Sequence, residues 1–349
     1  MKNAFFFLFM ASSLFFLTSC DQDDPVPDEP IKSFNDGVFI SCEGAFGQGN
    51  AVVYFLDLER SEYVPEIYRT VNQKSIGDVL QSMQFEDDKA YLVVNNSGKI
   101  IEVEKETFLE TGSISGLNSP TEIEIENGKG YIGSLYSDHI LVADMGGLTI
   151  TDTLYLGEQS NFVREEDDRL WVLSQSEYQG RVKNHVYYIN LSNGVVDSLA
   201  VGANPLHWAF GEDDELFVYC QGTQAGDNPS IYTINTGNQT VEGKTDLDVD
   251  AGFFSRLAYD DYSNRLLVQL ADGIYTYQSQ GNISDSPIIP LQDVEFVYAM
   301  DVDPTNGRIY LSDARDFASA GGVLIFTNEG ELFATIPQVG IGPNHFYFE

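Results

Sequence analysis

The chain has 349 residues, with 18 lysines and arginines against 54 aspartates and glutamates, which gives a formal net charge of −36. This charge excludes nucleic acid as a partner, because phosphate binding requires a basic surface, and it also excludes electrostatic adhesion to anionic lipid. Hydrophobic residues make up 43% of the chain, which is ordinary for a folded protein, so the acidity does not indicate disorder. The 3 cysteines provide neither a disulfide framework nor the spacing of zinc ligands.

The first twenty residues have the pattern of a targeting segment. Lys2 precedes an apolar run from Ala4 to Leu17, which at ~1.5 Å per residue is too short to cross a hydrocarbon core of ~30 Å. The run ends in Leu-Thr-Ser-Cys, which resembles a bacterial lipobox. This pattern predicts a lipoprotein signal peptide over residues 1–19 and a lipidated Cys20 as the mature N-terminus. Ordinary cleavage beside a chance cysteine is the alternative.

Residues 20–35 are predicted to form a tether that carries the lipid. Five acidic residues and three prolines between Asp21 and Pro30 cannot pack into a core, so this stretch should be extended and solvated. An acidic run directly after the lipidated cysteine resembles the surface-export signal of Bacteroidetes lipoproteins, and a plain spacer is the alternative. We therefore expect a lipid-anchored protein of the outer membrane that is exposed at the cell surface and touches the membrane through its lipid.

The rest of the chain, residues 36–349, repeats one pattern seven times and is predicted to be a single domain. Each copy has a short β-rich run after a polar turn, and these runs start at residues 37, 89, 129, 169, 215, 265 and 308. A partner run follows each of them and starts at residues 52, 100, 140, 186, 231, 273 and 323. Seven units of this size, each able to supply four strands, predict an all-β, seven-bladed β-propeller with little helix.

The two ends of this repeat complete each other. An inner strand is predicted before each first run, but the copy at Gly37 has none before it, and the last inner strand, Asn344–Phe348, has no partner after it. We expect the ring to close by pairing this C-terminal strand with the first blade, which removes two open sheet edges. A six-bladed ring is the alternative, and it would leave one of the seven copies unexplained.

A four-stranded blade, with strands a to d from the centre outward, places its connections on two faces. The a–b and c–d turns form one face, here called the hairpin face, and they are short and acidic. The b–c loops and d–a connections form the other, here called the loop face, and they vary in length and carry aromatic and amide side chains. Such variation on a repeated scaffold is typical of a binding surface. We therefore expect the acidic charge in the tether and on the hairpin face, away from a ligand site.

The predicted ligand-binding residues lie on the loop face or on the inner strands near the mouth of the central tunnel. They are Phe46, Asn50, Asp78, Asn96, Tyr136, Tyr178, His207, Trp208, Phe254, Arg256, Tyr298, Arg315 and His345. His207 and His345 occupy nearly equivalent positions and could face the tunnel together, as hydrogen-bonding or ligand-contacting groups rather than as a metal pair. Cys42 and Cys220 end equivalent strands and are interpreted as buried apolar side chains.

The chain contains no nucleophile elbow, phosphate loop, zinc-protease motif or Cys-x-x-Cys. We therefore predict no catalytic residue, no metal and no cofactor, and the sequence favours a non-catalytic protein. A propeller lactonase or lyase stays open as an alternative. It would require carboxylates or histidines that converge on the tunnel mouth, where the sequence places His207, Arg256 and His345.

Three stretches, Ser41–Asn50, Gly77–Met83 and Lys89–Phe108, resemble the opening of the YncE-like, DUF5074-type propeller lipoproteins of Bacteroidetes. Gly116–Pro120 and Gly202–Pro205 continue the pattern at later blades. This group includes surface cobalamin-binding propellers that sit on TonB-dependent corrinoid transporters. The resemblance implies capture of a small-molecule nutrient, such as a corrinoid, and its handover to a TonB-dependent outer-membrane transporter. The later blades depart from the usual Val-x-Val-Ile-Asp phrase of the group. A protein-interaction scaffold without a small ligand is the alternative.

Overall fold

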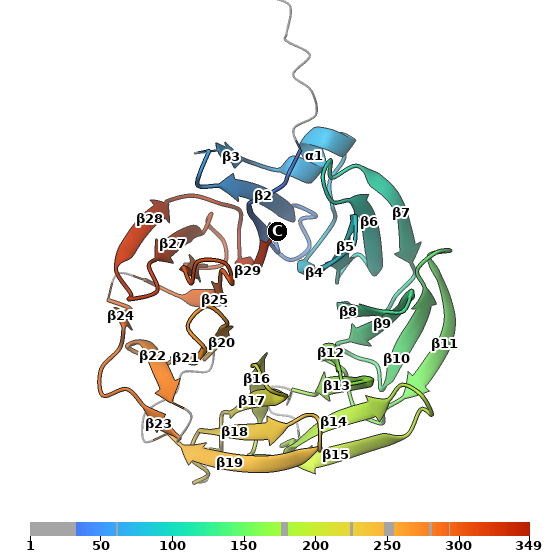
Figure 1. Cartoon of the computed structure of the whole chain (residues 1–349). Coiled ribbons are helices and arrows are strands. Elements are labelled where there is room, and N and C mark those ends of the chain that lie inside the picture. Colours follow the sequence, from blue (N-terminus) through green and yellow to red (C-terminus); the bar gives the residue numbers. More distant parts are fainter. Residues whose placement is uncertain are drawn as a thin grey trace, which may run out of the picture. The chain divides into compact units, whose positions relative to one another are not determined.

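The computed structural model describes residues 33–60, 62–175, 181–223, 226–247, 255–278, 281–292 and 294–349. Ser33–Glu349 form one unit of seven antiparallel sheets around a central axis (Figure 1). The predicted all-β, seven-bladed β-propeller is therefore confirmed. The described residues contain one short helix, α1 (Ile67–Asn72), and no helix among them is long and apolar enough to cross a membrane.

Each blade has its strands in the order a to d from the centre outward, and blade 1 is formed from both ends of the chain. The inner strands of blades 1 to 7 are β29 (Pro343–Phe348), β4 (Leu80–Glu86), β8 (Pro120–Glu126), β12 (Phe162–Glu166), β16 (Pro205–Phe210), β20 (Leu257–Asp260) and β25 (Val297–Val302). The b strands are β1 (Val38–Cys42), β5 (Lys89–Val94), β9 (Lys129–Ser134), β13 (Arg169–Leu173), β17 (Glu215–Cys220), β21 (Arg265–Gln269) and β26 (Ile309–Asp313). The c strands are β2 (Val52–Asp57), β6 (Lys99–Glu104), β10 (His139–Asp144), β14 (His185–Asn190), β18 (Ser230–Asn235), β22 (Gly273–Gln278) and β27 (Gly322–Phe326). The outer strands are β3 (Glu62–Val64), β7 (Glu110–Ser115), β11 (Thr149–Tyr155), β15 (Val196–Ala200), β19 (Thr240–Asp246) and β28 (Leu332–Ile336), and in blade 6 both β23 (Asn282–Ile283) and β24 (Ile289–Pro290) pair with β22.

The b strands carry much of the hydrophobic core, because neighbouring blades cover both of their faces. Strands β1 and β26 are buried along their whole length, whereas nearly every residue of the outer strand β11 is exposed. Continuous runs of β-branched and aliphatic residues suit a strand that is buried on both sides. One core cluster joins Val93 of β5 to Ile123 of β8, so the space between blades 2 and 3 is filled by side chains of both blades.

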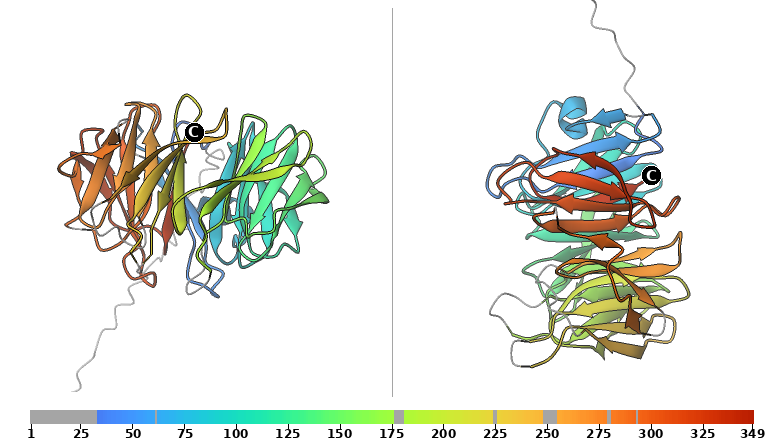
Figure 2. Two further views of the ribbon diagram at one scale, coloured as in Figure 1. Left: turned by 90° about the horizontal axis from the view of Figure 1, so that it is seen from below. Right: turned by 90° about the vertical axis from the view of Figure 1, so that its left-hand side faces the viewer.

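The predicted closure of the ring is confirmed. Strand β29 pairs antiparallel with β1, and in this register Val38 lies opposite Phe348 and Ser41 opposite His345. Strand β29 therefore takes the inner position of blade 1 and becomes part of the tunnel wall (Figure 1). Figure 2 turns the ring on edge and shows the connections gathered on two opposite faces, which are the hairpin face and the loop face.

The described chain begins on the hairpin face. Phe34 is buried, and its N–H donates to the carbonyl oxygen of Glu106, in the c–d turn of blade 2, at 2.8 Å. The N–H of Gly37 donates to the carbonyl oxygen of Glu349, just after β29, at 2.9 Å. Both acceptors lie at the hairpin-face ends of their strands. The segment that precedes Ser33 therefore joins the propeller on the side opposite the loop face.

Replacing Asn344 by alanine should weaken the closure of the ring. Its Nδ2 donates to the carbonyl oxygens of Leu80 and Gln81, both at 2.9 Å, and its Oδ1 accepts from Ser41 Oγ at 2.7 Å. The alanine removes these three hydrogen bonds of a buried side chain, so we expect the free energy of unfolding to fall by about 2–3 kcal/mol. Urea unfolding measures the change, with the exposed Asn282→Ala as the control. Equal stability of the two variants would contradict the expectation.

Candidate functional site

The inner strands enclose a tunnel along the propeller axis, and part of this tunnel is a cavity of ≈ 220 Å³. The cavity is lined from five blades, through strands β4, β8, β12, β16 and β29. Its charged and titratable side chains include Glu122, Glu124, Arg164 and His345, and Trp208 contributes an aromatic wall. Distant parts of the sequence meet here because every blade presents its a strand to the same axis.

Two glutamates of β8 face this cavity. Oε2 of Glu122 accepts a hydrogen bond from the backbone N–H of Val163 at 2.8 Å. Burial raises the pKa of Glu122 to about 8, and this hydrogen bond opposes part of the effect. Burial likewise raises the pKa of Glu124 to about 7, against the positive charge of Arg164. Both carboxyl groups therefore change their protonation near neutral pH.

Arg256 precedes β20 and enters the tunnel from its loop-face end. Its Nε donates to the carbonyl oxygen of Tyr298 at 3.1 Å, and its Cζ lies 5.6 Å from the centre of the Tyr298 ring. The guanidinium lowers the pKa of both His207 in β16 and His345 in β29, and it opposes the raised pKa of Asp301 in β25. Arg256 belongs to blade 6 but affects the pKa of side chains on the inner strands of blades 5, 7 and 1. We therefore place its guanidinium in the space that these strands enclose.

Both tunnel histidines are neutral at pH 7. Nδ1 of His207 accepts the backbone N–H of Leu257 at 3.3 Å. Burial, followed by the charges of Arg256 and His345, lowers the pKa of His207 well below its usual value. Burial and Arg256 lower the pKa of His345 to about 4. The electrostatic contact between the two imidazoles places them near each other, and the residues that the structure describes contain no group of three metal-ligating side chains.

Two more carboxyl groups, those of Glu43 and Asp301, lie along the tunnel, and both accept hydrogen bonds. The hydroxyl of Tyr298 donates to Oε1 of Glu43 at 2.9 Å, and burial raises the pKa of Glu43. Oδ2 of Asp301 accepts the backbone N–H of Phe346 at 3.1 Å, and burial raises the pKa of Asp301 to about 6. The ring of Tyr298 also packs edge-on against Phe317, with ring centres 4.9 Å apart. Side chains of blades 1, 6 and 7 therefore fix one another in place.

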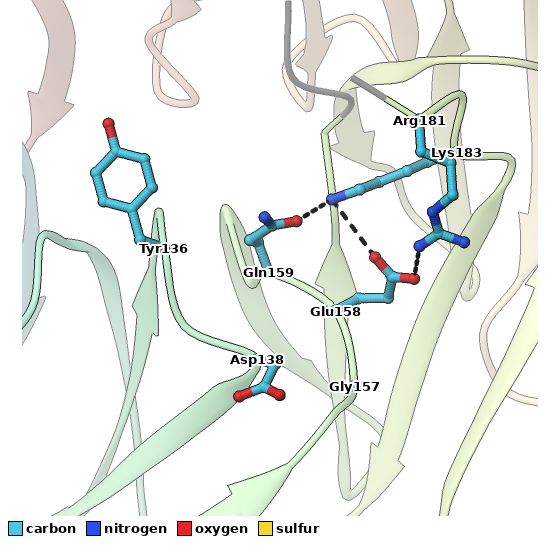
Figure 3. A pocket seen from close by; sticks show the side chains of 7 residues that line it. All are labelled: Tyr136, Asp138, Gly157, Glu158, Gln159, Arg181 and Lys183. Carbon is cyan, nitrogen blue, oxygen red and sulfur yellow. Dashed lines mark hydrogen bonds and ion pairs between the residues drawn. The ribbon is translucent and has the colours of Figure 1, made fainter.

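A second cavity, of ≈ 520 Å³, opens on the loop face between blades 3 and 4 (Figure 3). Three connections build it: the b–c loop of blade 3, the connection from β11 to β12, and the b–c loop of blade 4. Its lining residues are Tyr136, Asp138, Gly157, Glu158, Gln159, Arg181 and Lys183. We call this cavity the Tyr136 pocket.

One wall of the Tyr136 pocket is a network around Lys183, which is 8% exposed. Its Nζ donates to Ser174 Oγ at 2.7 Å and to Oε1 of Gln159, and it lies 3.6 Å from Oε2 of Glu158. Glu158 also forms an ion pair with Arg181. Figure 3 shows the ring of Tyr136 standing across the pocket from this network. The pocket therefore combines a polar wall with fixed geometry and an aromatic ring that is 66% exposed.

The structure brings some of the predicted ligand-binding residues together and separates others. His207, Trp208, Arg256, Tyr298 and His345 gather along the tunnel, and Tyr136 lines the pocket on the same face. Tyr178, Phe254 and the lipidation residue Cys20 lie outside the described residues, as do the predicted signal peptide and most of the tether.

The remaining predicted residues lie outside both cavities, and four of them form hydrogen bonds within or between the loops. Oδ1 of Asn50 accepts the N–H of Ala45 at 2.8 Å, and Arg315 donates to two carbonyl oxygens near its own loop. Asp78 accepts from the side chain of Asn96 and from a backbone N–H of the neighbouring blade's loop. Phe46 has its side chain in solvent, with 77% of its surface exposed.

Sequence reasoning missed the carboxyl groups of the tunnel. Glu43, Glu122, Glu124 and Asp301 lie along it, so the acidic charge is not confined to the tether and the hairpin face. The signal for two of them was present, because Glu122 and Glu124 alternate with isoleucines on a predicted inner strand. On an inner strand of a propeller, the polar set of such an alternation faces the tunnel instead of bulk solvent.

The two cysteines of the described chain, Cys42 and Cys220, are free and fully buried, as interpreted from the sequence. Burial raises the pKa of both thiols, that of Cys220 to about 12. Thiols with such a raised pKa are poor nucleophiles. They take part in the core and not in a site.

Comparison with known proteins gives one family and many propellers of low identity. Residues 36–311 match the family model described as Domain of unknown function (DUF5074). No curated protein matches the chain.

Among solved structures, a quinonprotein alcohol dehydrogenase-like protein from Bacteroides thetaiotaomicron matches with a TM-score of 0.73 and 14% identity, over 90% of this chain and 79% of that chain. A protein from Lactobacillus plantarum matches with a TM-score of 0.63 and 16% identity, over 90% of this chain and 99% of that chain. Apo AztD from Citrobacter koseri has a TM-score of 0.54 and 12% identity, over 87% of this chain and 82% of that chain. At these identities the likeness shows the fold alone.

Replacing Glu122 by glutamine should make the folded protein less sensitive to pH. The raised pKa means that the folded state holds this proton more tightly than the unfolded chain. The free energy of unfolding of the wild type therefore falls as the pH rises from the usual value of 4.5 to about 8. The glutamine keeps an acceptor for the N–H of Val163, so we expect a gain of about 1 kcal/mol near pH 8 and little change near pH 5.

Urea unfolding of both proteins at the two pH values measures this difference. Glu329→Gln, in the exposed c–d turn of blade 7, is the matched control. An equal gain from the control, or a pH profile of Glu122→Gln that follows the wild type, would contradict the assignment of Glu122.

Proposed function

The chain belongs to the DUF5074 family, whose function is unknown, and we propose that it is a surface-anchored lipoprotein that binds a ligand. In this role it captures a small nutrient on its loop face and passes it to a TonB-dependent transporter of the outer membrane. The observation that carries the proposal is the Tyr136 pocket, which opens on the face from which Arg256 enters the tunnel.

The Tyr136 pocket has the size and lining of a site for a small organic molecule. Its ≈ 520 Å³ lies within the range of ~300–1,000 Å³ that is usual for ligand sites. The exposed ring of Tyr136 offers an apolar face, and the Lys183 network offers polar groups that are already fixed. The two acidic and two basic side chains of the lining balance each other. These features favour an uncharged part of the ligand in this pocket, one that is rich in amide or hydroxyl groups.

The place where the described chain begins supports capture at a surface. The described chain starts on the hairpin face, where Phe34 is buried. A lipid at Cys20, joined through the acidic segment, would hold the protein from that side and leave the loop face open. Exchange of a ligand with a transporter requires such an unobstructed face.

A corrinoid is one candidate for the nutrient, through the resemblance of the first blades to cobalamin-binding propellers. Its amide-bearing periphery suits Gln159 and the neighbouring charged groups, and its apolar faces suit Tyr136. A molecule of this size exceeds the Tyr136 pocket and would extend from it across the loop face. Other nutrients with amide or hydroxyl groups satisfy the same chemistry.

Calorimetric titration with cobalamin and cobinamide tests the proposal. We expect stoichiometric binding, and we expect Tyr136→Ala to weaken it at least tenfold, because the ring supplies the apolar contact of the pocket. Tyr262→Ala is the matched control, since Tyr262 is 56% exposed in the a–b turn of blade 6, on the hairpin face.

Flat titrations with both compounds would remove corrinoids as the ligand. An equal loss of affinity in Tyr136→Ala and Tyr262→Ala would show that the loop-face pocket is not the binding site. Isolation of the protein with a transporter from detergent-solubilised outer membranes tests the proposed partner, and its absence from every such complex would count against handover.

A further inference from the structure

We propose that Arg256 is the centre of an oxyanion site in the tunnel, which binds a carboxylate or phosphate group with the help of His207 and His345. The inference deepens the proposed function, and it rests on that proposal in taking the oxyanion to be part of the captured ligand. The site itself is argued from the contacts of one arginine.

The guanidinium of Arg256 is partly buried and lies over the ring of Tyr298, but it lacks the carboxylate partner that such an arginine normally has. Its Nε donates to a backbone carbonyl, but its two terminal nitrogens make no hydrogen bond and no ion pair with any residue that the structure describes. Arg265, in the b strand of the same blade, is the opposite case: its Nε lies 2.9 Å from Oδ2 of Asp260, and its NH2 donates to the carbonyl oxygen of Asn328. Buried charges are usually paired, so Arg256 is unusual within its own blade.

The nearest carboxyl groups have other partners. Glu43 accepts from the hydroxyl of Tyr298, and Asp301 accepts the backbone N–H of Phe346. Both influence the charge of Arg256 electrostatically, but neither forms an ion pair with it. The four terminal N–H groups of the arginine are therefore available to a ligand that enters the tunnel.

The two histidines add N–H donors, and the ring of His207 also has a hydrogen bond to the backbone of Trp208. Because Nδ1 of His207 accepts the N–H of Leu257, a neutral His207 carries its proton on Nε2, which makes that nitrogen a donor. His345 lies on the strand that closes the ring and is a neutral imidazole as well, with one N–H of its own. One fixed positive charge and two imidazole N–H groups from blades 5, 6 and 1 form a set that an oxygen anion can satisfy.

The two tunnel histidines also allow the binding of an anion to be measured. Titration of the imidazole nitrogens by NMR follows all four histidines of the chain, with acetate and inorganic phosphate as separate probes. An anion beside Arg256 favours the protonated imidazole, so we expect the pKa of His207 and His345 to rise by about one unit. His139 and His185 begin c strands far from the axis and should not respond. The stronger response to one probe tells a carboxylate site from a phosphate site.

Arg256→Gln should abolish the response, and Arg69→Gln, at an exposed position of helix α1, should leave it intact. If Arg256→Gln does not fold, Arg256→Lys decides, because it keeps the charge but loses the planar pair of donors, and its response should weaken at least fivefold. Equal shifts in all four histidines, or a full response in the folded arginine variant, would overturn the site. Such a failure leaves the cobalamin titration of the Tyr136 pocket unaffected, so the two proposals fail separately.

Discussion

The pairing of β29 with β1 is the contact on which the other features of the molecule depend. It joins residues that lie 304 positions apart, such as Ser41 and His345. The closing strand does more than cover an edge. It brings His345 to the tunnel, gives Asp301 a backbone N–H from Phe346, and lets Asn344 bond to blade 2. Without this strand the tunnel would have an open side, and the groups around Arg256 would face bulk water.

Burial along a narrow polar tunnel explains the electrostatic behaviour of the site. Carboxyl groups there are less stable in their charged form, so Glu122, Glu124 and Asp301 have raised pKa values. Imidazoles are disfavoured as cations for the same reason, so His345 stays neutral. Arg256 cannot become neutral in the same way, because a guanidinium keeps its proton in proteins. Arg256 and Arg164 are therefore fixed positive charges in a region whose carboxyl and imidazole groups adjust their protonation.

The sequence repeat made the fold predictable, but it did not make the contacts of individual side chains predictable. An inner strand was predicted before the run that starts at residue 129, and β8 lies there, because alternating residues between polar turns identify a half-buried strand. Glu122 was overlooked, because a glutamate on a strand usually faces bulk solvent and nothing local shows that it lines a tunnel. Asn50 and Arg315 were predicted as ligand contacts, and their hydrogen bonds to backbone atoms of loops could not be predicted, because no spacing rule gives the shape of those loops.

The closing strand also has a consequence for how the chain acquires its structure. The first blade cannot be finished while β29 is still missing, so β1 keeps an unpaired edge through most of synthesis. Contacts between such distant residues make folding slow, because a long loop must close before the contact contributes any energy. An incomplete chain with an open edge is prone to pair with other chains. In the exported lipoprotein that we propose, late completion of the ring would keep the chain unfolded until the closing strand is made.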